Sequence, residues 1–402
     1  MKLFLGKDSK GNAPVYLEIG GSRAMLICGK RGSGKSYTMG VLIEELLNGS
    51  EPVIPIVIDP MGIYHTMGGR NALQSNELYG WGLASRAYRV RLLIPGEPEH
   101  LYDPEVLAAM QTRGVEVVPL RLNPADLSPD GWCDLFGLNI NTPIGITLFR
   151  AVQHLAKQPG FRIADVMHNI ELDGQAQDVS KQALLNRLEA AGAWNIFRTS
   201  NQYEPIDTIF EPGIVNVVDV SRLESGPRGL RNLIVSVICR NLFRKRADAR
   251  LREEFGLNAG LPRVWLTIDE AHQFVPAGST TLAKEQIIRW AKEGRQPGLS
   301  LVVATQQPSA VDNEVLSQCD IILSHKLTTK ADVAALNSLS QDYMGGELRT
   351  FIKQLNRSGE SVLVDDERES VTLLKIRPRQ SSHGGSSITP TEQEQIDLWN
   401  PL

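Results

Sequence analysis

The chain has 402 residues, of which 42% are hydrophobic and 22% charged, the balance of an ordinary soluble globular protein. Its formal net charge of -4 argues against a surface that is basic throughout, so any nucleic acid is expected at a local basic patch such as the lining of a pore. No apolar stretch is long enough to span a bilayer and no signal peptide is apparent, which predicts a cytoplasmic protein that does not contact a membrane. The length suits two or three domains or one elaborated α/β domain.

The cysteines exclude the common zinc motifs. They form no CxxC pair and have no zinc-site spacing. We expect them to be small buried hydrophobic residues in a reducing compartment. They are Cys28, Cys133, Cys239 and Cys319.

Before residue 123 the sequence predicts short strands and one clear helix. Residues 1–22 are expected to be a short N-terminal β segment, and residues 23–122 the first part of an α/β core. The helix, over residues 36–47, carries apolar residues at helical spacing. The strands are expected at residues 3–5, 15–19, 24–28, 54–58, 90–94 and 115–120. Such alternation predicts an α/β fold with a mainly parallel central sheet.

Residues 123–204 have a different pattern. Helices are expected at 144–156 and 179–191, separated by polar, glycine-bearing joints. We interpret this segment as a helical insertion into the α/β core.

The α/β pattern resumes over residues 205–380, the expected second part of the core. Helices are expected at 230–254 and 284–292. The first ends in a basic stretch that we interpret as a solvated helix face, and contact with DNA is the less favoured interpretation. Strands are expected at 214–218, 264–268, 301–304, 320–323, 360–364 and 371–376, the last two as a hairpin. Residues 381–402 begin with a stretch rich in Ser and Gly, which predicts a C-terminal tail or arm.

A complete phosphate-binding loop occupies residues 29–36, which match GxxxxGKS between a predicted strand and a predicted helix. The glycines allow backbone N–H groups to point at phosphate oxygens, Lys35 reaches the outer phosphates, and Ser36 supplies a hydroxyl to magnesium. A chance match is improbable in that context. The motif predicts ATP and Mg²⁺ as ligands. The expected nucleotide-binding residues are Gly29, Lys30, Arg31, Gly32, Ser33, Gly34, Lys35, Ser36 and Tyr37.

An acidic pair follows the apolar strand predicted at 264–268. Asp269 would join Ser36 in supporting magnesium, and Glu270 would polarise the attacking water as a general base. One acidic pair after a strand is weak evidence alone, because such loops are often acidic, but it gains weight beside a phosphate loop. His272, two residues on, is more often structural than a metal ligand.

Two further polar positions are candidates for catalysis. Gln306 follows a buried strand, where it could sense the γ-phosphate, although an ordinary polar strand end is a reasonable alternative. Arg295 lies in a glycine-bounded loop and could be an arginine finger that acts across a subunit interface. A solvated surface arginine is nearly as good an interpretation of Arg295.

Together these elements resemble the HerA branch of the HerA/FtsK ATPases. Besides the phosphate loop, the matching sequences are VIDP at 57–60, IDEAH at 268–272, GR at 294–295, ATQ at 304–306, LSQC at 316–319 and SHGG at 382–385. The resemblance covers residues 23–65 and 205–385 well and the insertion poorly. It implies a RecA-like core, a hexameric ring, ATP-driven translocation of double-stranded DNA, and a partner nuclease or other effector in DNA repair or anti-phage defence.

The sequence departs from that family at several points. Ile63 stands where an acidic residue is common, Gln307 replaces the arginine of a Gln-Arg-Pro sequence, and Lys326 replaces a frequent arginine. Only 28 residues precede the phosphate loop in this sequence, so we expect the N-terminal barrel of the archaeal proteins to be missing from it.

The leading hypothesis is therefore a ring-forming ATPase that translocates on or remodels DNA. An ATP-binding oligomeric scaffold that assembles and regulates an effector, with little translocation, is the alternative. A helicase of the DEAH-box type ranks low, because the sequence lacks a late helicase motif rich in glutamine and arginine.

Overall fold

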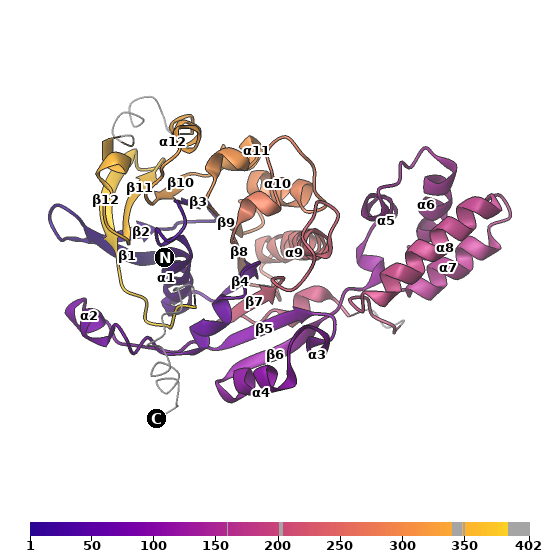
Figure 1. Cartoon of the computed structure of the whole chain (residues 1–402), viewed down its shortest axis with the longest axis horizontal. Coiled ribbons are helices and arrows are strands. Elements are labelled where there is room, and N and C mark those ends of the chain that lie inside the picture. The colour runs from indigo at the N-terminus through magenta and orange to yellow at the C-terminus, as the bar shows by residue number, and fades with distance from the viewer. Residues whose placement is uncertain (159, 201–203, 340–347, 349, 385–402) are drawn as a thin grey trace.

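The computed structural model describes residues 1–158, 160–200, 204–339, 348 and 350–384. A large sheet forms the centre of the core, and helices α5 to α8 project from one side of it (Figure 1). The sheet has 12 strands in the order β2-β1-β12-β11-β10-β3-β9-β8-β4-β7-β5-β6. Its strands are β1 Lys2–Asp8, β2 Pro14–Glu18, β3 Ala24–Cys28, β4 Val53–Asp59, β5 Val90–Pro95, β6 Val115–Leu120, β7 Val215–Asp219, β8 Arg263–Ile268, β9 Leu299–Thr305, β10 Ile321–Ser324, β11 Glu360–Asp365 and β12 Ser370–Ile376.

The sheet is parallel from β10 through β6 and antiparallel from β2 through β11, where the hairpin of β11 and β12 joins the N-terminal strands. The prediction of a mainly parallel α/β sheet is therefore confirmed. In the parallel part, Cys28 of β3 pairs with Thr305 of β9, and Ile268 of β8 pairs with Val303. These registers bring the carboxyl ends of the central strands to one edge of the sheet.

Besides a helical stretch at residues 350–354, twelve labelled helices accompany the strands in the described part of the chain. They are α1 Lys35–Asn48, α2 Ser75–Gly80, α3 Pro98–Leu101, α4 Pro104–Thr112, α5 Pro129–Phe136, α6 Pro143–Leu155, α7 Ile163–Leu172, α8 Asp178–Ala193, α9 Leu230–Glu254, α10 Lys284–Glu293, α11 Asn313–Leu316 and α12 Lys330–Asn337. Short 3-10 turns link several of them, including one at Tyr64–Gly68 after β4.

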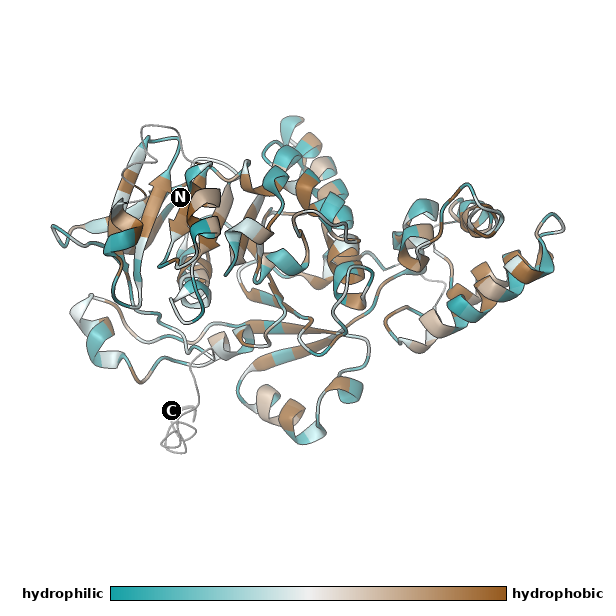
Figure 2. Cartoon of the chain, turned by 45° about the horizontal axis from the view of Figure 1, so that its top comes forward, coloured by the Kyte–Doolittle hydropathy of each residue, from teal (hydrophilic) through white to brown (hydrophobic). Residues whose placement is uncertain are grey.

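The central strands are buried on both faces, which explains their unbroken apolar runs. Met25 and Ile27 of β3 share one hydrophobic cluster with α1, whereas Leu26 and Cys28 share the other with α9 and α10. This is the alternation that strand geometry imposes. Figure 2 shows hydrophobic residues along the strands of the core and on the inner sides of the helices.

The segment interpreted as a helical insertion contains α5 to α8. The helices expected at 144–156 and 179–191 are found as α6 and α8, whereas α5 and α7 were not predicted. Trp132 lies fully buried against the ring of Phe197, with centroids 5.4 Å apart, so the helices are anchored to the chain that returns to the core. Among the described residues, every helix is too short or too polar to cross a bilayer.

Two sequence interpretations need correction. The start of the expected C-terminal tail is not free: Ser381 is fully buried and its N–H donates to Glu44 on α1, 2.8 Å away. Residues 385–402 lie outside the described part. The basic end of α9 is not wholly solvated either, because Arg246 is buried and pairs with Glu253 at 2.7 Å. In both places, local composition indicated solvent; a contact across 337 positions buries Ser381, whereas an ion pair within α9 holds Arg246.

Candidate nucleotide-binding site

The phosphate loop links the carboxyl end of β3 to the amino end of α1. Gly29, Gly32 and Gly34 have positive φ angles of 154°, 73° and 111°, conformations that favour glycine. A Cβ atom on Gly29 would lie 2.6 Å from Cβ of His325, so this position also needs glycine for space. The loop backbone is thus shaped to turn N–H groups inward at the start of a helix, where anions bind.

Lys35 is the first residue of α1, and only 5% of its surface is exposed. Burial lowers the pKa of its ammonium group, and the nearby carboxylates of Glu270 and Asp269 counteract that shift. A cation held in a partly dry site among acidic groups is suited to a triphosphate, whose negative charges would favour the protonated form further.

Asp269 follows β8 and meets residues from two other elements. Its Oδ2 atom accepts hydrogen bonds from the hydroxyls of Ser36 and Tyr64, each at 3.0 Å. Burial and the neighbouring Glu270 raise the pKa of Asp269, because both disfavour a second charge there. The structure therefore brings together the two residues predicted to hold magnesium, and it adds Tyr64, which the sequence analysis did not assign.

A magnesium ion fits this donor set. Mg²⁺ prefers oxygen ligands and is usually held by one or two carboxylates together with substrate phosphates and water. Asp269 and Ser36 offer a carboxylate and a hydroxyl oxygen beside the phosphate loop, with Asp269 almost fully buried.

Glu270 has a backbone in the left-handed region, with φ 47° and ψ 48°, which is unusual for a non-glycine residue. Gln306 donates a hydrogen bond through Nε2 to Oε1 of Glu270. The other oxygen, Oε2, is buried without a hydrogen-bond partner and lies 3.5 Å from Nδ1 of His272. His272 also lies 3.3 Å from the hydroxyl of Thr305. The ends of β8 and β9 thus hold one carboxylate with an acceptor oxygen still available.

Arg295 lies elsewhere. It is exposed in the turn between α10 and β9, before the amino end of that strand. The phosphate loop follows carboxyl strand ends, and the seven residues of β9 separate the two edges by roughly 20 Å. Within one chain the structure therefore does not bring Arg295 to the other candidate residues.

His325 braces the phosphate loop and was missed by the sequence analysis. Burial lowers its pKa to about 4, so the ring is neutral at physiological pH. Its Nδ1 lies 3.0 Å from the carbonyl of Glu360, which requires the proton there, so Nε2 accepts from the Thr38 hydroxyl at 2.9 Å. A histidine at the end of the strand adjacent to β3 was the available signal.

The residues that depart from the family pattern are engaged through their backbones. The N–H of Ile63 donates to Asp59 at 2.7 Å, and that carboxylate also accepts from three neighbouring N–H groups. The N–H of Gln307 donates to the Thr305 hydroxyl at 3.0 Å. The carbonyl of Lys326 accepts from Lys30 of the phosphate loop at 2.9 Å. These contacts use backbone groups, so they do not depend on which side chain stands at positions 63, 307 and 326.

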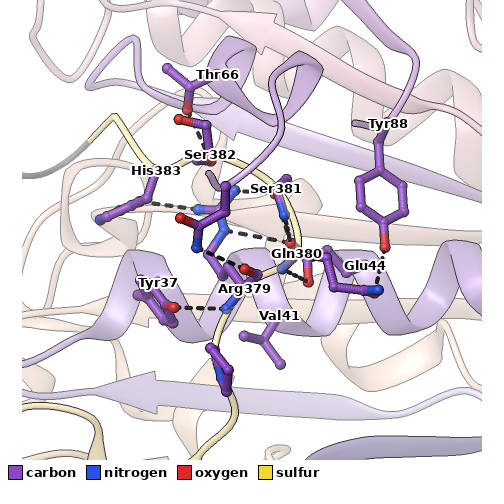
Figure 3. A network of polar contacts seen from close by, with 12 residues as sticks. Tyr37, Val41, Glu44, Thr66, Tyr88, Arg379, Gln380, Ser381, Ser382 and His383 are labelled. Atoms are coloured by element: carbon purple, nitrogen blue, oxygen red, sulfur yellow. Dashed lines mark hydrogen bonds and ion pairs between the residues drawn. The ribbon is translucent and has the colours of Figure 1, made fainter. Parts of the chain in front are cut away.

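Tyr37, one residue beyond the phosphate loop, joins α1 to the C-terminal strap, which we define as residues 377–383. Its hydroxyl accepts from the N–H of Arg379 at 2.7 Å (Figure 3). The same hydroxyl donates to Gln74 at 2.8 Å. The ring packs edge-on against His383, with centroids 5.4 Å apart.

Glu44 fixes the strap to the middle of α1. This fully buried carboxylate accepts from Arg377 at 2.8 Å. It also accepts from the N–H of Gln380 at 3.1 Å and from the hydroxyl of Ser381 at 2.6 Å (Figure 3). The guanidinium of Arg379 lies 3.7 Å from Glu44. It fills the space beside Gly40, where a Cβ atom would be only 2.5 Å from the guanidinium carbon. The strap is thus part of the wall around the phosphate-loop helix.

The fold and this site define a P-loop ATPase with a RecA-like core. The fold is similar to that of VirB4 of Thermoanaerobacter pseudethanolicus, with a TM-score of 0.56 and 15% identity over 97% of this chain and 98% of that one. It is also similar to the bacterial conjugative coupling protein TrwBdeltaN70, with a TM-score of 0.51 and 10% identity over 95% of this chain and 92% of that one.

The chain belongs to the HerA family, because the model of the helicase HerA central domain matches residues 3–242. Probable helicase MJ1565 of Methanocaldococcus jannaschii is 23% identical over 94% of this chain and 67% of its own length. The DNA double-strand break repair helicase HerA of Sulfolobus acidocaldarius is 23% identical over 69% of this chain. The match spans only 58% of that HerA protein.

Proposed function

We propose that this chain hydrolyses ATP to drive movement on, or remodelling of, double-stranded DNA. The observation that carries the proposal is the convergence of Lys35, Ser36, Asp269 and Glu270 at one edge of the sheet. Membership of the HerA family supports the choice of DNA as the substrate on which the motor acts.

Each residue of the site has a proposed role. Lys35 binds the outer phosphates, Ser36 and Asp269 hold Mg²⁺, and Tyr64 fixes the orientation of Asp269. Bound Mg²⁺ would offset the phosphate charge. Glu270 would take a proton from the attacking water through Oε2, the oxygen that accepts no hydrogen bond.

Gln306 holds Glu270 in place and is positioned to respond when a γ-phosphate arrives or leaves. Because its amide donates to Oε1, a phosphate oxygen that competed for the same donor would change how Glu270 is held. We propose this exchange as the phosphate-sensing step.

The catalytic assignment is tested with Glu270→Gln. Loss of a general base lowers turnover by roughly 10²- to 10⁴-fold while the affinity for ATP stays within a few-fold, measured by steady-state phosphate release and by ATP binding. Glu99→Gln, which alters an exposed carboxylate on α3, is the matched control with unchanged turnover. Wild-type turnover in Glu270→Gln would refute the assignment.

Arg295 is proposed to complete the site of a neighbouring subunit in a ring, with six subunits as the expected number. Its location at the opposite edge of the sheet supports action in trans rather than within the chain. Lys35→Ala and Arg295→Ala should each be inactive alone. Mixing them should restore activity, because some interfaces then combine an intact Lys35 with an intact Arg295. No recovery, or a monomer in solution with ATP and duplex DNA, would refute this role.

An effector protein, such as a nuclease in DNA repair or anti-phage defence, is the proposed partner. The alternative is a scaffold that assembles such an effector with little translocation. The helices that project from the core (Figure 1) favour a partner surface. Leu172 of α7 and Val179 of α8 are 70% and 81% exposed there. Stimulation of ATP turnover by duplex DNA would favour the motor. A ring without such stimulation that still binds its effector would favour the scaffold.

A further inference from the structure

Arg231 joins three segments at the carboxyl edge of the sheet. Its Nε atom donates to the carbonyl of Leu223 at 2.9 Å, and its Nη2 atom donates to the carbonyl of Ser221 at 3.0 Å. Its Nη1 atom donates to the side-chain oxygen of Gln273 at 3.1 Å. The guanidinium therefore ties α9 and the turn after β7 to the segment that follows β8.

The turn after β7 is a firm support for this contact. Asp219, the last residue of β7, is only 3% exposed, and its Oδ1 atom accepts from the N–H of Ser221 at 2.9 Å. The neighbouring strand β4 holds the turn as well, because the N–H of Val220 donates to the carbonyl of Asp59 at 3.1 Å. Arg231 is thus anchored on backbone carbonyls whose positions are set by two buried strands.

The segment after β8 carries the carboxylate that faces the phosphate loop. Gln273 is the last residue of the 3-10 turn Ala271–Gln273, and its N–H donates to the carbonyl of Glu270 at 2.9 Å. Glu270 has a left-handed backbone, with φ 47°, which persists in a residue with a Cβ atom only where its surroundings hold it. A contact that fixes Gln273 therefore helps to keep Glu270 in that conformation.

The helix by itself does not explain an arginine at position 231. Arg231 is the second residue of α9, where the positive end of the helix dipole disfavours a cation. Burial also lowers the pKa of its guanidinium, and the negative charge of Asp219 counteracts that shift. Hydrogen bonds from a charged donor are roughly twice as strong as neutral ones, so the three that Arg231 donates can offset both penalties.

We propose that Arg231 is a positioning residue for ATP hydrolysis, which holds the segment of Glu270 against the turn after β7. The inference rests on the proposed function, because it takes Glu270 as the general base. Arg231 acts through Gln273, whereas Gln306 contacts the carboxylate of Glu270 directly. The two contacts restrain different parts of one residue, since Gln306 holds its side chain and Arg231 holds its backbone.

The test compares Arg231→Gln in two backgrounds, wild type and Glu270→Gln, by single-turnover hydrolysis of ATP on the full chain with Mg²⁺. Misplacing a reacting group by about 1 Å can cost about a hundredfold, so Arg231→Gln should lower the rate about 10- to 100-fold. The affinity for ATP, measured by calorimetry, should stay within about threefold of wild type. In the Glu270→Gln background the same change should lower the rate less than about threefold, because the carboxylate that it positions is already absent.

Two further variants separate positioning from general damage. Gln273→Ala removes the same hydrogen bond from the other side, so it should lower the rate by a similar factor, and the double variant with Arg231→Gln should be no slower than the slower single variant. Arg244→Gln is the matched control and should keep the wild-type rate, because Arg244 is an exposed arginine of the same helix that contacts Asn241. Circular dichroism melting identifies any variant that has lost its fold. If Arg231→Gln is one of them, Gln273→Ala in the same two backgrounds carries the test.

The outcomes distinguish this inference from the proposed function. If Glu270→Gln hydrolyses ATP at the wild-type rate, the proposed function fails, and the inference fails with it. If Glu270→Gln is slow but Arg231→Gln and Gln273→Ala are not, only the inference is refuted. An equal fall in both backgrounds would also refute it, because Arg231 would then act on the site by a route that does not include Glu270.

Discussion

The buried carboxylate of Glu44 offers a sharp test of what holds the C-terminal strap in place. It is fully buried, as is its partner Arg377, and their closest atoms are 2.8 Å apart. Arg379 is also buried and lies 3.7 Å away. Glu44→Ala would leave Arg379 without an acidic partner among the described residues and would orphan two backbone N–H groups of the strap.

The expected loss follows from these contacts. Removing one member of a buried ion pair costs about 3–5 kcal/mol, because the remaining charge has no compensation. Glu45 still pairs with Arg377 at 2.8 Å, which limits the damage on that side. Glu44→Gln retains one acceptor oxygen but turns an amide toward donors, so we expect a smaller loss of about 2 kcal/mol.

Urea-induced unfolding followed by tryptophan fluorescence measures these changes as free energies of unfolding. Glu293→Gln removes an exposed i,i+4 pair with Arg289 and serves as the control, with an expected change of about 0.3–0.5 kcal/mol. A loss below about 1 kcal/mol for Glu44→Ala would refute the reasoning, since it would mean that the strap is not held by this carboxylate.

Three further predictions concern the same region. Gly40→Ala should destabilise the protein, because the new Cβ would meet the buried guanidinium of Arg379. Alanine is otherwise favoured over glycine in helices by about 1 kcal/mol, so a higher melting temperature would contradict the contact. Tyr64→Phe removes one donor to Asp269 and should raise the Mg²⁺ concentration for half-maximal ATP turnover about three- to tenfold, whereas an unchanged Mg²⁺ titration would exclude a positioning role. His325 has a pKa of about 4 in the folded protein against an ordinary value of 6.5, so the unfolded chain binds its proton first and the free energy of unfolding should fall as pH drops from about 6.5 to about 4. His325→Gln should flatten that part of the pH profile, and an equally steep profile would rule His325 out as its source.

Much of the fold could be predicted because its signals are local. The strand at Ala24–Cys28, the loop at 29–36 and the helix at Lys35–Asn48 occur where the apolar runs and the glycines indicated them. Asp269 and Ser36 could be paired from sequence because the acidic pair and the phosphate loop each follow the carboxyl end of a parallel strand, and those ends lie at one edge of the sheet. The helices α5 and α7 were missed although both are amphipathic, because elements of eight and ten residues offer few turns over which a helical period can be recognised.

The sequence by itself determined the phosphate loop and the acidic pair, because both are contiguous and their chemistry depends on residue type and spacing. Only the tertiary structure decided which distant side chains complete the site. Tyr64 reaches Asp269 across 205 positions and the strap reaches Glu44 across more than 300, contacts that leave no local pattern. The stretch around Ser381 is rich in Ser and Gly and so indicated a tail or an arm. A buried carboxylate needs many donors, and the backbone and hydroxyl groups of that stretch supply them.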